Sequence, residues 1–198
     1  SAPIEVRERV AFPPCAGRGF LRRLKDEGVV SEAVLLSTCN RTEVYVVVED
    51  EDARGRVLDL LAEDRGVGRA SLEQDTYWLT DAEAVRHLYR VASSLDSMVV
   101  GEGQILGQVR EAYRAATEEH CAGQILNRLF HTSLRVGKRG RSETRIGDSS
   151  LSVPRAAVKL AEEVFGDLAG RRALILGAGD MSELVVKHLK DRGVADLL

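Results

Sequence analysis

Cys39 lies in the chemically most reactive stretch of the chain, residues 37–43, which combines a thiol with hydroxyl, amide, guanidinium and carboxylate groups. Arg41 follows the cysteine by two residues, and a positive charge nearby lowers the pKa of a thiol. These residue types therefore indicate a thiolate nucleophile of the kind that forms covalent acyl intermediates. A buried structural cysteine in a turn is the alternative that the local sequence leaves open.

Two predicted strands hold this stretch. Residues 34–36 and 44–48 are apolar runs, and the second is rich in β-branched residues, which is typical of strands. The connection contains neither Asn-Gly nor Asp-Gly, the pairs that favour tight hairpins. Its positions carry polar side chains instead, and loops held by rigid strands often carry catalytic groups. We therefore predict two strands that present Cys39 in their connecting turn.

The composition is typical of a globular protein with one or two domains. The chain has 198 residues, of which 44% are hydrophobic and 30% charged, and its formal net charge of -3 gives no general attraction to nucleic acid. Three widely spaced cysteines make no disulfide framework, and no Cys/His spacing indicates a metal site. The sequence has no signal peptide and no apolar run that could span a membrane. We expect a cytoplasmic protein with free thiols, no metal and no membrane partner.

The first 146 residues predict a small mixed layer followed by helices. The expected elements are a strand at 4–10, a helix through 21–24 that ends near Gly28, the two strands described above, and helices at 53–65, 81–92, 105–119 and 123–140. The order β-α-β-β-α at the start is typical of an α+β subdomain. We therefore expect an α/β and α+β chain whose catalytic domain, residues 1–146, joins this subdomain to a helical one.

Residues 147–198 have the pattern of a linker helix and the beginning of a Rossmann-like domain. A helix is predicted at 152–165, and a buried-strand run at 172–176 leads into a Gly-rich turn and a helix at 183–192. Such a turn lets a pyrophosphate approach the helix N-terminus. Ser182 occupies the position of the third glycine. The predicted cofactor-binding residues are Gly177, Ala178, Gly179, Asp180, Met181 and Ser182.

Both ends of the chain look incomplete. Ser1 is not a methionine, and the last residues before Leu198 resemble the opening of a strand. We therefore expect a piece of a longer protein. The residue that distinguishes NAD from NADP follows the glycine turn by about 20 residues, which places it beyond Leu198.

Several stretches together resemble the glutamyl-tRNA reductase family. They are the catalytic loop at 37–43, the end of an N-terminal motif at 1–3, two signatures at 87–93 and 95–108, and shorter matches at 137–139, 143–144 and the Gly177 turn. The resemblance spans essentially the whole chain. It implies a nearly complete catalytic domain, the beginning of an NADPH-binding domain, and a C-terminal dimerisation helix that this sequence lacks.

The resemblance implies a reaction, a cofactor and partners. The reaction is the NADPH-dependent reduction of glutamyl-tRNA(Glu) to glutamate-1-semialdehyde, the first step of tetrapyrrole (5-aminolevulinate, porphyrin and heme) biosynthesis. Cys39 would attack the ester, release the tRNA and form a thioester, which accepts hydride more readily than an oxygen ester. The implied partners are the charged tRNA, a second copy of the protein in a homodimer, and the aminomutase that takes the semialdehyde.

The resemblance also assigns site residues. His87 would act as an acid/base or substrate-orienting group, although a single helical histidine is more often structural. Arg41 would bind the substrate's side-chain carboxylate with support from Glu43, and Glu102 would pair with the ammonium group or favour a helix start. The implied substrate-binding set is Thr38, Cys39, Asn40, Arg41, Ser97, Glu102, Gly103, Gln104 and Gln108. Many relatives carry proline in place of Gly103.

Two other functions stay open on the sequence. A cysteine-dependent aldehyde or semialdehyde dehydrogenase would join a thioester to a Rossmann unit but act on small acids or phosphates and ignore tRNA. A non-catalytic domain that binds charged tRNA or a regulatory partner would tolerate Cys39→Ser. A basic cluster could contact tRNA phosphates or form an ordinary solvated face; it comprises Arg128, Arg135, Lys138, Arg139, Arg141 and Arg145. Cys15 and Cys121 match no family motif and are expected in a loop and in a helix connection.

Overall fold

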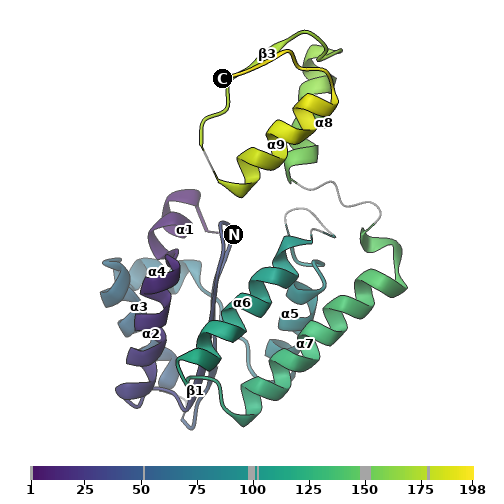
Figure 1. The fold of residues 1–198 in the computed structure, drawn as a ribbon. Coiled ribbons are helices and arrows are strands. Elements are labelled where there is room, and N and C mark those ends of the chain that lie inside the picture. Colours follow the sequence, from purple (N-terminus) through teal and green to yellow (C-terminus); the bar gives the residue numbers. More distant parts are fainter. Residues whose placement is uncertain (1, 51, 98–100, 102, 148–152, 178) are drawn as a thin grey trace.

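The computed structural model of the chain describes residues 2–50, 52–97, 101, 103–147, 153–177 and 179–198. At the centre of its larger part, an antiparallel hairpin is flanked by helices (Figure 1). Strands β1 (Glu32–Ser37) and β2 (Thr42–Val47) pair from Glu32 opposite Val47 to Ser37 opposite Thr42. The predicted strands are therefore confirmed, and residues 38–41 form the turn that carries Cys39.

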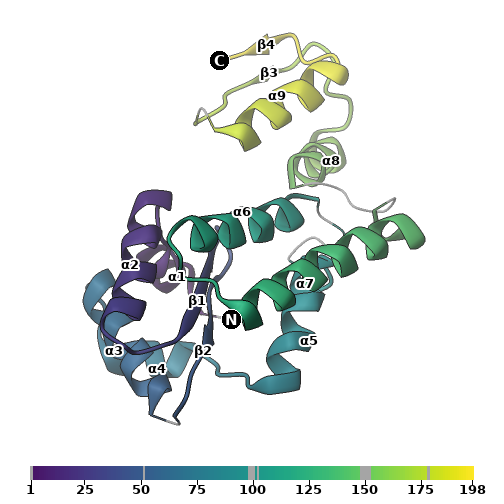
Figure 2. The ribbon, with the colours of Figure 1, turned by 60° about the horizontal axis from the view of Figure 1, so that its bottom comes forward.

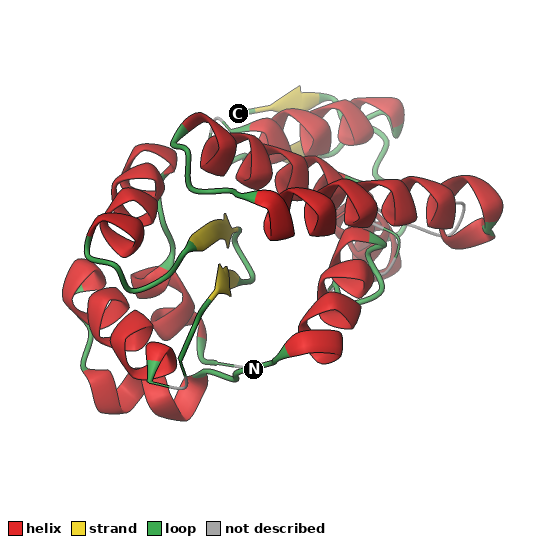
Figure 3. Cartoon of the chain, turned by 90° about the horizontal axis from the view of Figure 1, so that it is seen from below, coloured by secondary structure: helices red, strands yellow, loops and turns green. Residues whose placement is uncertain are grey.

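Helices cover both sides of the hairpin, as the view along the strands shows (Figure 3). Residues 33–36 of β1 are buried in succession, which requires apolar neighbours on both faces of the strand. Phe20 of α2 (Pro14–Asp26), Val109 of α6 (Gln104–Glu118) and Phe130 of α7 (Gln124–Glu143) are fully buried in this core. The apolar run that predicted a strand thus also made β1 the centre of the core.

The first element is a helix, and the predicted strand at its position is wrong. Helix α1 (Ile4–Val10) begins directly after Pro3, whose φ of -53° suits a helix start. Three apolar residues in seven are too few for alternation to decide between strand and helix. The other helices of this group are α3 (Ala53–Arg65), which ends at Gly66 as predicted, and α4 (Arg69–Asp75), which the sequence did not predict. The order from α1 to α4 is therefore α-α-β-β-α-α.

The three helices predicted after residue 81 are confirmed. They are α5 (Asp81–Ala92), α6 and α7, followed by a short 3-10 turn, η1 (Arg145–Gly147). Glu32 of β1 caps the start of α7, because its two carboxylate oxygens accept hydrogen bonds from the backbone N–H groups of Ile125 (3.1 Å) and Leu126 (2.7 Å). This cap fixes α7 against the hairpin.

Helices α5 and α7 approach so closely at Gly137 that we expect Gly137→Ala to destabilise the fold. A Cβ at this position would lie 2.5 Å from the backbone oxygen of Ala92 and 2.8 Å from Cδ1 of Leu106. Overpacking of this kind costs about 1–3 kcal/mol, more than the roughly 1 kcal/mol that alanine gains over glycine in a helix. Urea unfolding would measure the loss, with Gly19→Ala in α2, which meets open space, as control. A stabilised Gly137→Ala variant would contradict the close approach.

The second part of the chain forms a small βαβ unit with its own core. Helix α8 (Val153–Phe165) precedes β3 (Arg172–Ala173), α9 (Asp180–Asp191) and β4 (Asp196–Leu197), and β3 pairs with β4 in parallel (Figure 2). The core of this unit comprises Val158, Leu168, Leu189 and Val194. It is separate from the core around β1, but the division at residues 146 and 147 stays a prediction. The linker residues 148–152 lie outside the described residues.

The predicted buried strand at 172–176 is shorter and more exposed than expected. Its regular part ends at Ala173, and the side chains of Leu174 and Leu176 are 66% and 86% exposed. A parallel strand is buried only where elements cover both of its faces. Among the described strands, only β4 pairs with β3. No helix in the described part of the chain is long and apolar enough to cross a membrane.

Candidate functional site

Thr38 shapes the turn that carries Cys39. Its hydroxyl accepts hydrogen bonds from the backbone N–H groups of Asn40 and Arg41, both at 3.2 Å, and its own N–H donates to the carbonyl of Arg41 at 2.8 Å. A threonine hydroxyl can replace the backbone pairing that Asn-Gly turns provide. Cys39 is exposed and forms no disulfide. The alternative of a buried structural cysteine is therefore wrong.

Helix α1 and the segment that follows it anchor the hairpin tip. Asn40 accepts a hydrogen bond from Nη1 of Arg7 (3.1 Å), and Ser37 Oγ accepts one from the N–H of Phe12 (2.9 Å). Thr42 Oγ1 donates to the carbonyl of Val10 (3.2 Å). Thr38 and Asn40 are thus already engaged in holding the loop. The tip is fixed in position before any ligand arrives, which suits a nucleophile that must meet its target in one orientation.

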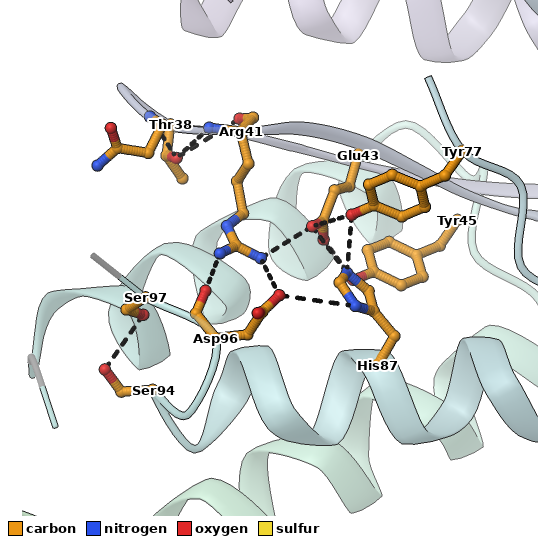
Figure 4. A network of polar contacts seen from close by, with 10 residues as sticks. Thr38, Arg41, Glu43, Tyr45, Tyr77, His87, Ser94, Asp96 and Ser97 are labelled. Carbon is orange, nitrogen blue, oxygen red and sulfur yellow. Dashed lines mark hydrogen bonds and ion pairs between the residues drawn. The ribbon is translucent and has the colours of Figure 1, made fainter. Parts of the chain in front are cut away.

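A polar cluster lies next to the turn, where β2 faces α5 (Figure 4). Glu43 is its centre: Oε1 accepts from Nη1 of Arg41 at 2.9 Å and lies 2.8 Å from Nε2 of His87 on α5. The hydroxyl of Tyr45 donates to Oε2 at 2.6 Å, and that of Tyr77 donates to Oε1 at 3.3 Å. The Glu43 side chain is only 10% exposed. One buried carboxylate therefore collects four donors, which come from the turn, β2, α5 and the segment before α5.

The cluster keeps Glu43 ionised. Burial raises the pKa of its carboxyl, but hydrogen bonds from His87 and Tyr45 and the charge of Arg41 outweigh burial, so the pKa is lowered overall. Burial, followed by the charge of Glu43, raises the pKa of Tyr77 to about 12, and the same two causes raise the pKa of Tyr45. Both hydroxyls therefore stay protonated at neutral pH and donate. The prediction that Glu43 supports Arg41 is confirmed.

Arg41 also contacts Asp96 in the segment after α5. Its Nη1 lies 3.5 Å from Oδ2 of Asp96, and its Nη2 donates to the backbone carbonyl of the same residue. The second ring nitrogen of His87, Nδ1, lies 3.8 Å from Oδ2 of Asp96. The guanidinium therefore already has three oxygen partners, and a substrate carboxylate must share it or displace one of them.

Ser97, another predicted substrate-binding residue, follows this segment directly. Its hydroxyl accepts a hydrogen bond from Ser94 Oγ at 3.2 Å. Because Ser97 follows Asp96 directly, it lies in the segment that contacts Arg41 of the hairpin turn (Figure 4). Glu102, also predicted to bind substrate, lies outside the described residues.

The remaining predicted substrate-binding residues lie at the start of α6. Gly103 precedes this helix, and a Cβ on it would lie 2.8 Å from Nη1 of Arg141 at the end of α7. Nε2 of Gln104 contacts the sulfur of Met181 at 3.3 Å, and Gln108 is exposed one turn further along α6. Among the described residues, no hydrogen bond or ion pair joins any of the three to the Glu43 cluster, so their role in binding stays a prediction.

The other two cysteines differ from Cys39 in their surroundings. Cys15 is exposed in the first turn of α2, so its predicted place in a loop is wrong. Cys121 lies in the connection between α6 and α7, as predicted. It is buried there, and burial raises the pKa of its thiol. Neither thiol lies in the turn beside the polar cluster, which leaves Cys39 as the candidate nucleophile.

Three members of the cluster were not predicted as site residues. Tyr45 had a local signal, because it alternates with Glu43 along β2 and so shares the face of Glu43, two residues after Arg41. Asp96 and Tyr77 carry no such signal, since they come from segments on either side of α5. Their contacts with Arg41 and Glu43 depend on where α5 lies relative to β2, which the packing of α5 against α6 and α7 sets.

The glycine turn of the second part fits a nucleotide. Gly177 has a φ of +122°, which favours glycine, and Gly179 precedes α9, which begins with Asp180 and Met181. A hollow of about 420 Å³ lies over this turn; its lining includes Ile175, Gly177, Ser182 and Leu197. Free N–H groups at a helix start favour a phosphate there. Ala178 is not among the described residues, and within those that are, no group of side chains could hold a metal ion.

The family of the glutamyl-tRNAGlu reductase N-terminal domain matches residues 1–144, and the shikimate/quinate 5-dehydrogenase family matches residues 159–198. The glutamyl-tRNA reductase of Rubrobacter xylanophilus is 75% identical over 197 residues, and that of Pelobacter propionicus is 48% identical over 199 residues. Each match covers 100% of this chain and 46% of the relative.

A solved structure of a glutamyl-tRNA reductase also matches the whole chain. Glutamyl-tRNA reductase from Methanopyrus kandleri superimposes with a TM-score of 0.69 and 37% identity, over 100% of this chain and 46% of that one. The chain thus spans about half the length of these proteins.

Proposed function

The chain belongs to the glutamyl-tRNA reductase family, and from this premise we propose that it carries the thioester-forming half of a glutamyl-tRNA reductase. The whole protein would reduce glutamyl-tRNA(Glu) to glutamate-1-semialdehyde with NADPH. Residues 1–146 would form the catalytic domain and residues 147–198 the beginning of the NADPH-binding domain. The observation that carries the proposal is the exposed thiol of Cys39, held on a fixed turn beside the cluster of Arg41, Glu43 and His87.

The proposed chemistry of this chain is an acyl transfer. The Cys39 thiolate attacks the ester carbonyl carbon, a carbon–sulfur bond forms, and the bond to the ribose oxygen breaks. The tRNA leaves with a proton on that oxygen, and the glutamyl group stays on Cys39 as a thioester. Arg41 would bind the side-chain carboxylate of the glutamyl group, with Glu43 fixing the guanidinium.

We assign His87 a substrate-orienting role within this reaction. Its Nε2 is 2.8 Å from Glu43, and its Nδ1 faces Asp96 at 3.8 Å. With both nitrogens directed at carboxylates, the ring is better suited to holding the site's geometry than to moving a proton. This favours one of the two roles that the resemblance left open.

NADPH would supply a hydride to the thioester when bound. Gly177, Gly179 and the start of α9 would hold its pyrophosphate, since they combine a left-handed glycine with free N–H groups. Ala178, Asp180, Met181 and Ser182 complete the proposed binding turn. The matched dehydrogenase family supports a nucleotide-binding domain here; the choice of NADPH over NADH rests on the family.

Further partners and the location follow from the same premise. We propose that the whole protein forms a homodimer and passes its semialdehyde to an aminomutase. It would work in the cytoplasm, where charged tRNA occurs and free thiols persist.

An acid quench tests the proposal directly. The chain is mixed with glutamyl-tRNA without NADPH, quenched and digested, and the peptides are analysed by mass spectrometry. The expected result is a glutamyl adduct on the peptide that contains Cys39 and none on those with Cys15 or Cys121. Absence of a Cys39 adduct, with tRNA bound, would favour the non-catalytic alternative.

We expect helix α7 to contact tRNA phosphates. Arg128, Arg135 and Lys138 are exposed on α7 and form no ion pair with any described residue. Each phosphate contact adds about 0.7–0.9 to the slope of log K against log salt, so Arg135→Gln with Lys138→Gln should lower that slope by roughly 1.5.

Fluorescence anisotropy of labelled glutamyl-tRNA at several salt concentrations would measure this slope. Arg114→Gln on α6 serves as control, because Arg114 already pairs with Glu111 (2.5 Å) and Glu118 (3.2 Å). An unchanged slope in the α7 variant would identify the basic cluster as a solvated face.

A further inference from the structure

The ion pair between Arg41 and Asp96 closes the place where the substrate's glutamyl group should bind. That group carries a side-chain carboxylate and an α-ammonium, so it needs one cation and one anion close together. We propose that Asp96 binds the α-ammonium, after its contact with Arg41 opens to admit the side-chain carboxylate. The inference rests on the proposed function and names a further substrate-binding residue for it.

Asp96, and not Glu43, is the carboxylate that can move. Glu43 is 10% exposed and has four partners, of which three lie within 2.9 Å. The Asp96 side chain is 43% exposed, and its contacts with Arg41 and His87 are long, at 3.5 and 3.8 Å. A hydrogen bond at 3.5 Å is weak. Substrate can therefore displace the Asp96 carboxylate more easily than that of Glu43.

The charges in the cluster favour a cation at Asp96. Arg41 contributes one positive charge, and the ionised Glu43 in contact with it balances that charge. Asp96 supplies a second carboxylate, which is the more exposed of the two. A cationic group arriving from solvent therefore finds its partner at Asp96, while Arg41 keeps a face for an anion.

The backbone preserves the site while the carboxylate moves. Nη2 of Arg41 donates to the main-chain carbonyl of Asp96, a contact that does not involve the side chain. Arg41 thus stays next to this segment when the ion pair opens. The two charges of a glutamyl group sit on one short carbon chain, so neighbouring groups such as Arg41 and Asp96 can hold both while Cys39 meets the carbonyl.

The test compares two acyl donors that differ only in the ammonium group: the α-(S-benzyl) thioester of L-glutamate and the mono-(S-benzyl) thioester of glutarate. Cys39 attacks the thioester, the new carbon–sulfur bond forms, and benzylthiol leaves. Intact-mass spectrometry after an acid quench gives the acylation rate in a Cys15→Ser background. We expect Asp96→Asn to lower the rate with the glutamate thioester at least tenfold and to leave the glutarate rate within twofold.

Three results would overturn the inference while the proposed function stands. Equal losses on both thioesters would make Asp96 a residue that only positions Arg41. An unchanged preference of Asp96→Asn for the glutamate thioester would mean that Asp96 does not bind the ammonium group. If Glu102→Gln loses that preference and Asp96→Asn keeps it, Glu102 and not Asp96 binds the ammonium group. Restoration of the preference by Asp96→Glu would support Asp96.

The proposed function has its own readout in the same assay. Arg41→Gln should remove the preference for the glutamate thioester over the matching glutamine compound. A wild-type protein that neither thioester acylates at Cys39 would overturn the proposed function and this inference with it.

Discussion

Replacing Cys39 by serine is expected to lower ester cleavage of glutamyl-tRNA by on the order of 10³-fold or more, because a serine hydroxyl is a weak nucleophile without a general base. His87, the histidine of the cluster, already has its Nε2 engaged by Glu43 at 2.8 Å. Binding of the charged tRNA should remain, since the substitution exchanges one small exposed side chain for another. Single-turnover deacylation without NADPH would measure the rate.

The matched control is Cys15→Ser, which replaces the other exposed thiol of the chain. It should cleave the ester at the wild-type rate. Ester cleavage by Cys39→Ser at the wild-type rate would contradict a thioester mechanism. Unchanged binding with no cleavage in either protein would support a domain that only carries charged tRNA.

Acylation of wild-type Cys39 by two different acyl donors separates the two enzyme classes. A dehydrogenase of small acids would be acylated at Cys39 by a small acyl phosphate and would not respond to charged tRNA. We expect the opposite order of rates, because the chain belongs to a family named for its tRNA substrate. Faster acylation by a small acyl phosphate than by glutamyl-tRNA would favour the small-acid class.

Glu43→Gln is expected to reduce the free energy of unfolding by about 3 kcal/mol at pH 7, as removal of one partner from a buried ion pair usually does. The amide cannot balance Arg41, and its NH₂ group would face donors where the carboxylate accepted them. Urea unfolding would measure the change. Glu73→Gln, which alters an exposed pair with Arg69, should leave stability unchanged.

The pH dependence supplies a second test of Glu43. Its pKa is lowered in the folded protein, whereas an unfolded glutamate titrates near about 4.3. The stabilisation is therefore complete above that pH and is lost as the pH falls through the folded pKa. The stability difference between wild type and Glu43→Gln should shrink below about pH 4.3. A difference that stays constant down to pH 3 would mean that Glu43 is not ionised in the fold.

The strands, most helices and the reactive turn were predictable because their signals are local. A run of apolar residues, a glycine at a helix end and a polar stretch between two strands each act within a few positions. The prediction failed at 4–10, where three apolar residues fit strand and helix equally, and at 172–176, where burial depends on partners rather than on the run itself.

The sequence by itself determined the family, the candidate nucleophile Cys39 and the predicted Arg41–Glu43 contact, since all three depend on neighbours along the chain. The tertiary structure alone decided that Arg7 holds Asn40 in the turn, and that Asp96, 55 residues from Arg41, forms an ion pair with it where the glutamyl group should bind. The reason is that a contact across such a separation depends on where α5 lies relative to β2. The packing of α5 against α6 and α7 sets that position, and it arises from the buried core rather than from any spacing in the sequence.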